Sequence, residues 1–189
     1  MEWFTAAERF TTALASPEPT PGGGAAAAHA GAMGCALVMM AVSTTLKRKT
    51  TQESVKTKLE KSLKRLHALK TELASFVQKD GQAYAAYLTA RKLPKEDPAR
   101  PAALEQALVF AARVPADTAA TSLQVLKELE TIKDDIADII VSDIHCGKYL
   151  LQTAIRCAIE NVRANLVFIQ NEDVKASFEK QISSWIHWC

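Results

Sequence analysis

The chain has 189 residues, a formal net charge of +2 and 6% aromatic residues. It contains 32 alanines but only seven glycines and seven prolines. This composition favours helices over the many turns of a β-sandwich and nearly excludes an all-β fold. Charged residues of both signs make up 23% of the chain, too many for low-complexity disorder. We therefore expect a soluble, all-α, single-domain bundle of about six helices, up-and-down, over residues 1–189.

Loops rich in proline and glycine separate the predicted helices. Residues 16–24 contain three prolines and three glycines and cannot hold a regular helix. Residues 93–101 and the pair Val114-Pro115 predict two further breaks. The predicted helices span residues 2–15, 24–48, 51–91, 101–113, 116–140 and 143–170, and a short helix then reaches the C-terminus.

The N-terminal residues do not resemble a signal peptide, because no basic stretch precedes an uninterrupted apolar one. None of the four cysteines belongs to a C-x-x-C pair, which predicts reduced thiols and a cytoplasmic protein. These cysteines are Cys35, Cys146, Cys157 and Cys189. Residues 22–45 are long enough to span a membrane. They consist mainly of Ala, Gly and Met and contain His29, so we expect a buried helix and no membrane partner.

The predicted helix 51–91 carries an apolar stripe that includes one carboxylate. Its apolar positions are Leu59, Leu63, Leu66, Leu69, Leu73 and Phe76. Steps of seven from Leu66 lead to Leu73, Asp80 and Tyr87, which places Asp80 on the inward face. An unpaired carboxylate is costly to bury, so Asp80 is a candidate functional residue. The alternative is a distortion at Gly81 that turns Asp80 to solvent or makes it a helix cap.

A second polar set lies on the predicted helix 143–170. Asp143, Asn161 and Asn165 follow three- and four-residue steps on a face that is otherwise small and apolar. Because Asn is unfavourable inside helices, two of them on an inward face indicate a polar pocket or an interhelical hydrogen-bond network. Alternatively, Asp143 only stabilises the positive end of the helix, and the amides bond to nearby backbone.

Basic residues are concentrated in residues 47–79, where ten Lys or Arg and three Glu leave a net charge of +7. The rest of the chain has thirteen basic and eighteen acidic residues, a net charge of −5. The basic segment either binds a polyanion or is an ordinary solvated helix face with Lys and Glu four residues apart. Nucleic acid is the weaker partner, since the segment has no groove-reading motif or interleaved aromatic residues.

Gly22, Gly23 and Gly24 directly precede a predicted helix. Backbone N–H groups at the positive end of a helix bind phosphate or carboxylate, which makes the glycines candidate ligand contacts. Their spacing matches neither a Walker loop nor a Rossmann motif. The histidines and cysteines show no H-E-x-x-H or paired C-x-x-C spacing, so we expect no metal site.

Several segments resemble, in order, those of the cyclodeaminase/cyclohydrolase family of folate enzymes. The segments are residues 16–27, Asp80-Gly81-Gln82-Ala83-Tyr84 with Leu93-Pro94-Lys95, Ser142-Asp143, and Asn161-Val162-Arg163-Ala164-Asn165-Leu166. The family includes the C-terminal half of formiminotransferase-cyclodeaminase and stand-alone methenyltetrahydrofolate cyclohydrolase. The resemblance covers roughly residues 4–181 and predicts a stand-alone version.

The resemblance implies an all-helical homodimer with an active site near the subunit interface. It also implies that the protein acts on the one-carbon unit between N5 and N10 of tetrahydrofolate. The expected reaction is hydrolysis of 5,10-methenyltetrahydrofolate to 10-formyltetrahydrofolate. The alternative is cyclisation of 5-formiminotetrahydrofolate with release of ammonia. Both reactions need an acid/base group and stabilisation of a cation, and the resemblance implies no cofactor.

The resemblance also suggests roles for the candidate residues. Asp80 is the expected catalytic carboxylate, because a half-buried Asp can have the raised pKa that proton transfer requires, and Asp143 is the second candidate. The expected substrate contacts are Gly22, Gly23 and Gly24 through their backbone, Asn161 and Asn165 at the pterin, and Lys61 and Lys64 at a γ-linked polyglutamate tail.

Three places depart from the family pattern. Ala25 replaces a Ser that usually follows the glycines, Ile136-Ala137 replaces a Gly-Asn pair, and Asn171 stands where Asp is common. These departures leave a non-catalytic folate-binding or interaction protein on the same scaffold as an alternative function.

Overall fold

The computed structural model describes residues 2–189, so Met1, the first residue of the predicted domain, lies outside the described residues. The α-helices are α1 (Glu2–Leu14), α2 (Gly23–Leu46), α3 (Glu53–Arg91), α4 (Arg100–Ile132), α5 (Val141–Leu166) and α6 (Glu172–Trp185). Short 3-10 turns at Lys133–Asp135 and Asp138–Ile140 connect α4 to α5, and a third follows α6 at Ile186–Trp188. Residues 2–189 contain no strand, which confirms the predicted all-α fold with six helices.

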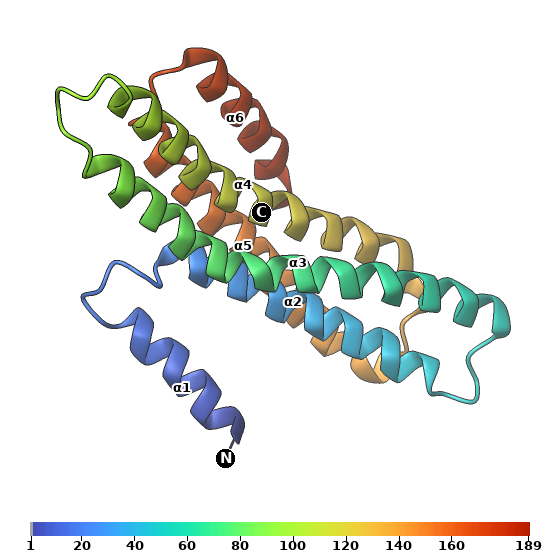
Figure 1. Ribbon diagram of the computed structural model, residues 1–189. Helices are drawn as coiled ribbons and strands as arrows, with labels where there is room; N and C mark the ends of the chain where they lie inside the picture. The colour runs from blue at the N-terminus through green and yellow to red at the C-terminus, as the bar shows by residue number, and fades with distance from the viewer. Residues whose placement is uncertain (1) are drawn as a thin grey trace.

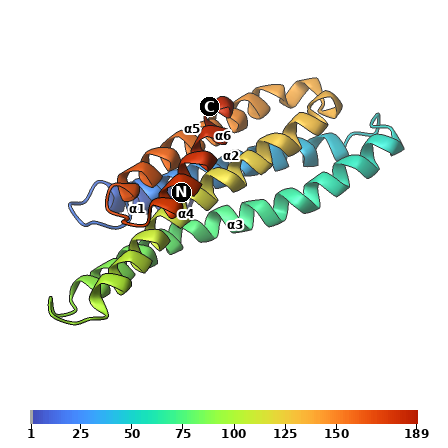
Figure 2. The same cartoon turned by 90° about the horizontal axis from the view of Figure 1, so that it is seen from above.

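Helices α2 to α5 form an up-and-down bundle (Figures 1 and 2). Both α2 and α4 pack against α3 and α5, and α6 lies on the outside of the bundle against α4 and α5. The N-terminal α1 projects away from the bundle in Figure 1. The ring of Phe10, near the end of α1, contacts His29 of α2 in a tilted arrangement, with ring centroids 4.7 Å apart and an interplanar angle of 47°.

The core contains the apolar stripe predicted on α3. Leu59, Leu66, Leu73 and Phe76 are buried at the seven- and three-residue steps expected from the sequence. Between α2 and α5 the core is thin, because Gly34 and Gly147 face each other there. A Cβ on Gly34 would lie 2.8 Å from the carbonyl oxygen of Gly147, so glycine is needed for this close helix crossing.

The predicted break at Pro115 is wrong, because α4 runs without interruption through Pro115, which is buried. Proline inside a helix removes one hydrogen bond and costs about 3 kcal/mol. Burial of Val114, Ala116 and the following face of α4 offsets this cost. The predicted helix 116–140 instead ends at Ile132, where the 3-10 turns begin.

Helix α2 meets the length and hydropathy criteria for a membrane span, with a mean hydropathy of 1.7 over its most apolar window. Within the fold, 56% of that window is buried against the other helices of the bundle. A core helix meets the same criteria, so the apolar character of α2 has a sufficient explanation in the bundle core.

Candidate functional site

A cavity of about 280 Å³ opens at the end of the bundle where α2 begins. The loop before α2, helices α3, α4 and α5, and the turn after α5 all contribute to its walls. The lining residues are Pro19, Thr20, Gly22, Gly23, Gly24, Asp80, Ala83, Tyr84, Tyr87, Leu108, Ala111, Asn161, Asn165 and Phe168. The cavity therefore brings together the predicted carboxylate on α3, the three glycines and the two asparagines.

Asp80 lies on α3 against the first turn of α2. Its Oδ2 atom accepts a hydrogen bond of 3.1 Å from the N–H of Ala25. Because α3 is regular through Gly81, the alternative of a local distortion there is wrong. Gly22 has no side chain to cap α2, so Asp80 supplies a cap from a different helix.

The helix start that we predicted to bind an anion thus already contacts a carboxylate of the chain itself. Asp80 occupies the N–H of Ala25, whereas no atom among residues 2–189 accepts a hydrogen bond from the N–H groups of Gly23 and Gly24. Both glycines line the cavity. Their N–H groups are therefore the part of the helix start that remains for a ligand.

Burial raises the pKa of Asp80 above its usual value, and the hydrogen bond from Ala25 partly offsets this by stabilising the ionised form. Among the described residues that line the cavity, Asp80 is the one acidic residue, and none is basic. A carboxyl with a raised pKa is suited to accept and return a proton during a reaction.

The glycines allow the start of α2 to approach its neighbours closely. A Cβ on Gly24 would lie 2.8 Å from Cγ of Asp80, and its separation from the nearer carboxylate oxygen would be shorter still. A Cβ on Gly23 would come within 3.3 Å of Nδ2 of Asn161. Glycine at position 24 is therefore required by the position of the Asp80 carboxylate.

The side-chain amides of Asn161 and Asn165 donate hydrogen bonds to backbone carbonyls. Nδ2 of Asn161 donates to the carbonyl of Cys157 at 2.8 Å. Nδ2 of Asn165 donates to the carbonyls of Asn161 at 2.8 Å and Ala111 at 3.2 Å. Both of the interpretations left open by the sequence therefore apply, since the amides line a polar pocket and also bond to backbone.

Pro115 explains why Asn165 bonds to α4. Proline has no N–H, so the carbonyl of Ala111, four residues earlier, lacks its usual helical partner. Asn165 on α5 donates to this carbonyl in its place. The carbonyl that Pro115 leaves free in α4 thereby holds Asn165, a cavity residue on α5.

The sequence did not identify the aromatic residues of the site. Tyr84 and Tyr87 follow Asp80 by four and seven residues on α3, and Phe168 follows Asn165 by three. The helical spacing from Asp80 was a usable signal for the two tyrosines. No such signal existed for Phe168, because it lies in the turn after α5.

The sequence pattern of the formiminotransferase-cyclodeaminase family matches residues 6–184. The chain belongs to this family. The resemblance stated from the sequence motifs is therefore confirmed. The formiminotransferase-cyclodeaminase match covers all the residues that line the cavity.

The chain is also similar to individual proteins in sequence and in structure. Formimidoyltransferase-cyclodeaminase of Sus scrofa is 34% identical over 93% of this chain, and the chain spans about a third of that relative (33%). Methenyltetrahydrofolate cyclohydrolase of Methylorubrum extorquens is 34% identical over 84% of this chain and 77% of its own length. The crystal structure of formiminotetrahydrofolate cyclodeaminase from Thermotoga maritima superposes with a TM-score of 0.84 at 26% identity, covering 97% of this chain and 87% of that one.

The structure shows the contacts of two residues that depart from the family pattern, Ala25 and Asn171. Ala25 is fully buried and supplies its N–H to Asp80, a bond that does not depend on the side chain. Asn171 caps α6, with its side chain accepting the N–H of Val174 at 3.1 Å, as an Asp side chain would.

Three predicted residues lie away from the cavity. Asp143 is in the first turn of α5, eighteen residues before Asn161 and about 27 Å from it along the helix. Lys61 and Lys64 are exposed on α3, sixteen or more residues before Asp80, which corresponds to about 24 Å or more. Within one chain, the structure does not bring these three residues together with Asp80. Among residues 2–189, no three His, Cys, Asp or Glu side chains gather as metal ligands.

Proposed function

We propose that the chain is a methenyltetrahydrofolate cyclohydrolase that converts 5,10-methenyltetrahydrofolate to 10-formyltetrahydrofolate. The observation that carries this proposal is the half-buried Asp80, held against the start of α2 with its pKa raised by burial. The similarity to the Methylorubrum extorquens cyclohydrolase, at 34% identity, supports the choice of reaction.

In the proposed reaction, water attacks the cationic carbon between N5 and N10 while ionised Asp80 accepts one of the water protons. The product of this step is a neutral tetrahedral carbinolamine. Its C–N5 bond then breaks as Asp80 returns the proton to N5, and the hydroxyl proton leaves to solvent. A formyl group remains on N10, and one proton is released for each water consumed.

The second candidate is formiminotetrahydrofolate cyclodeaminase, supported by the TM-score of 0.84 with the Thermotoga maritima enzyme. Here N10 attacks the formimino carbon, and ammonia leaves after protonation. The same carboxyl group would move the proton of N10 to the imino nitrogen, and a second proton, taken from solvent, lets this nitrogen leave as ammonia while the methenyl cation forms. The two reactions share the carbon centre and differ in the leaving group.

Parallel assays of the purified protein test both reactions. Hydrolysis is followed as loss of 5,10-methenyltetrahydrofolate absorbance, and cyclodeamination as ammonia released from 5-formiminotetrahydrofolate. We expect Asp80→Asn to lower turnover by about 100-fold or more. Asp117→Asn is the matched control, because burial also raises the pKa of Asp117 on α4, which does not line the cavity.

The outcomes of these assays separate the alternatives. Wild-type turnover by an Asp80→Asn protein with an unchanged helical circular dichroism spectrum would refute the role of Asp80. Tight binding of tetrahydrofolate without either reaction would instead support a non-catalytic folate-binding protein.

We also propose that the chain forms a homodimer through the outer face of α2. This helix has no Asp, Glu, Lys or Arg, and Met33 and Met40, seven residues apart on one face, are 42% and 41% exposed. An exposed apolar face on a helix without charged residues is suited to contact a partner. Light scattering after size exclusion should show a dimer that Met33→Glu with Met40→Glu converts to a monomer, and a monomeric wild type would contradict the proposal.

A further inference from the structure

Phe168 is an exposed aromatic residue at the edge of the cavity. It lies in the turn between α5 and α6, lines the cavity and is 61% exposed. A phenyl ring with this exposure gains little from packing within its own chain. Its position therefore depends on how the backbone of the turn is held.

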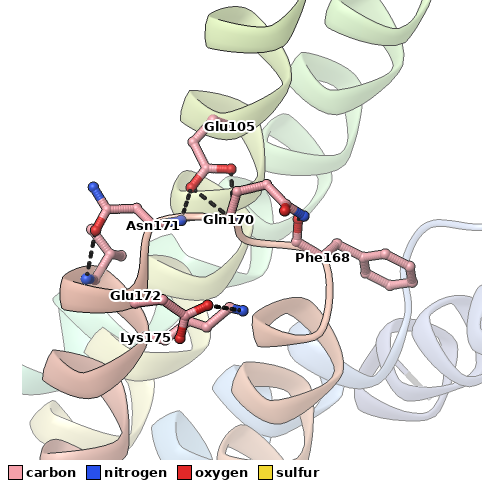
Figure 3. A network of polar contacts seen from close by, with 7 residues as sticks. Glu105, Phe168, Gln170, Asn171, Glu172 and Lys175 are labelled. Carbon is pink, nitrogen blue, oxygen red and sulfur yellow. Dashed lines mark hydrogen bonds and ion pairs between the residues drawn. The ribbon is translucent and has the colours of Figure 1, made fainter.

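A carboxylate from another helix holds this turn. Glu105 on α4 accepts the N–H of Gln170 at 3.1 Å through Oε1 and at 3.0 Å through Oε2. It also accepts the N–H of Asn171 at 2.9 Å. Figure 3 shows the Glu105 carboxylate against this backbone, with the ring of Phe168 directed away from it. Hydrogen bonds to an ionised acceptor are among the stronger ones in proteins.

The backbone on the other side of Phe168 is fixed as well. The N–H of Phe168 donates to the carbonyl of the cavity residue Asn165 at 3.1 Å. The next residue, Ile169, is completely buried in the core. Asn165 and Glu105 therefore hold the turn from both sides, and the ring of Phe168 stays at the cavity edge without core packing of its own.

We propose that Phe168 stacks on an aromatic ring of the substrate and that Glu105 is the positioning residue that holds Phe168 there. This inference rests on the proposed function, which supplies a ligand with aromatic rings. Tyr84 and Tyr87 line the same cavity from α3, so aromatic surface is available from two separate elements. Stacking between such rings prefers an offset or edge-to-face geometry, which requires a fixed backbone.

Tetrahydrofolate binding by calorimetry and KM and kcat with 5,10-methenyltetrahydrofolate test this inference. We expect Phe168→Ala to raise both the tetrahydrofolate Kd and KM about three- to tenfold with little change in kcat. Glu105→Gln should raise them about two- to fivefold, because the uncharged amide holds the turn less tightly. In the double variant, Glu105→Gln should add nothing to Phe168→Ala, since it acts through that ring.

Two matched controls separate this effect from general destabilisation. Val167→Ala changes the adjacent exposed residue of the same turn, which does not line the cavity. Glu128→Gln removes another α4 carboxylate, whose partners are Ser62 and Arg65 on α3. Both controls should retain the wild-type Kd and KM, and thermal unfolding of every variant monitors folding.

The results distinguish the inference from the proposed function. An active wild type whose Phe168→Ala variant keeps Kd and KM would overturn the inference alone. Additive effects of Glu105→Gln and Phe168→Ala would overturn the positioning role of Glu105. A wild type that neither binds tetrahydrofolate nor turns over either substrate would overturn the proposed function and the inference together.

Discussion

The hydrogen bond between Asn165 and Ala111 offers a test of how α4 tolerates its internal proline. Pro115 leaves the carbonyl of Ala111 without a helical donor, and Nδ2 of Asn165 donates to it at 3.2 Å. Removing this donor with Asn165→Ala leaves a partly buried carbonyl unpaired, which costs about 1–2 kcal/mol. The loss of the second bond, to Asn161, costs less because that carbonyl also has its helical partner.

The better helix propensity of alanine offsets part of this loss, by about 0.6 kcal/mol. We therefore expect Asn165→Ala to lower the free energy of unfolding by about 1 kcal/mol in the wild-type background. In a Pro115→Ala background, the new N–H at position 115 can bond to Ala111. There, Asn165→Ala should be neutral or slightly stabilising, so the two sites should couple by about 1–2 kcal/mol.

Urea denaturation followed by far-ultraviolet circular dichroism measures the four free energies of unfolding in this cycle. Asn161→Ala is a useful comparison, because among the described residues its amide donates only to Cys157, within the same helix. Its effect should be the same with and without Pro115. An equal loss from Asn165→Ala in both backgrounds would refute the explanation of the tolerated proline.

Two further predictions concern charged residues. Burial raises the pKa of Asp80, so ionisation of this residue opposes folding. The contribution of Asp80 to the free energy of unfolding is therefore largest below the pKa it has in the unfolded chain. It is lost as the pH rises through the pKa it has in the folded protein. Asp80→Asn should therefore raise Tm at neutral pH, by a margin that shrinks in acid; a margin independent of pH in Tm measurements would contradict this. Lys61→Glu with Lys64→Glu should raise KM only for substrates with long polyglutamate tails, since both lysines are about 24 Å or more from Asp80 along α3. An equal rise for the monoglutamate would exclude a tail site there.

Helical periodicity placed Asp80 on the inward face of α3, and the structure confirms that this face borders the cavity. Regular α3 geometry places every seventh residue on one face, so the position of Asp80 followed from Leu66 and Leu73. The asparagines of α5 were found in the same way. Periodicity also explains why Asp143 was grouped with them, since it shares their face but lies at the opposite end of the helix. A face is defined by angle alone, and distance along the axis has to be considered separately.

Interactions between distant segments could not be predicted from the sequence. The continuity of α4 depends on packing around Pro115, and its free carbonyl is satisfied by Asn165 from another helix. The anion at the start of α2 is Asp80, 55 residues later. The place of Phe168 depends on Glu105, which contacts a turn 65 residues further along the chain. None of these pairings has a local signature.

The crossing of Gly34 and Gly147 makes the cavity sensitive to substitutions far from it. These glycines lie on α2 and α5, as do Gly23 and Asn161, which face each other at the cavity. From Gly34 to Gly23 is eleven residues, about 16 Å along α2. A side chain at the crossing would push α2 and α5 apart. Because both helices are rigid and continue to the cavity, this displacement would also separate Gly23 from Asn161 at the cavity wall. Variation at these two positions is therefore constrained jointly, and a loss of activity can originate a long way from the substrate.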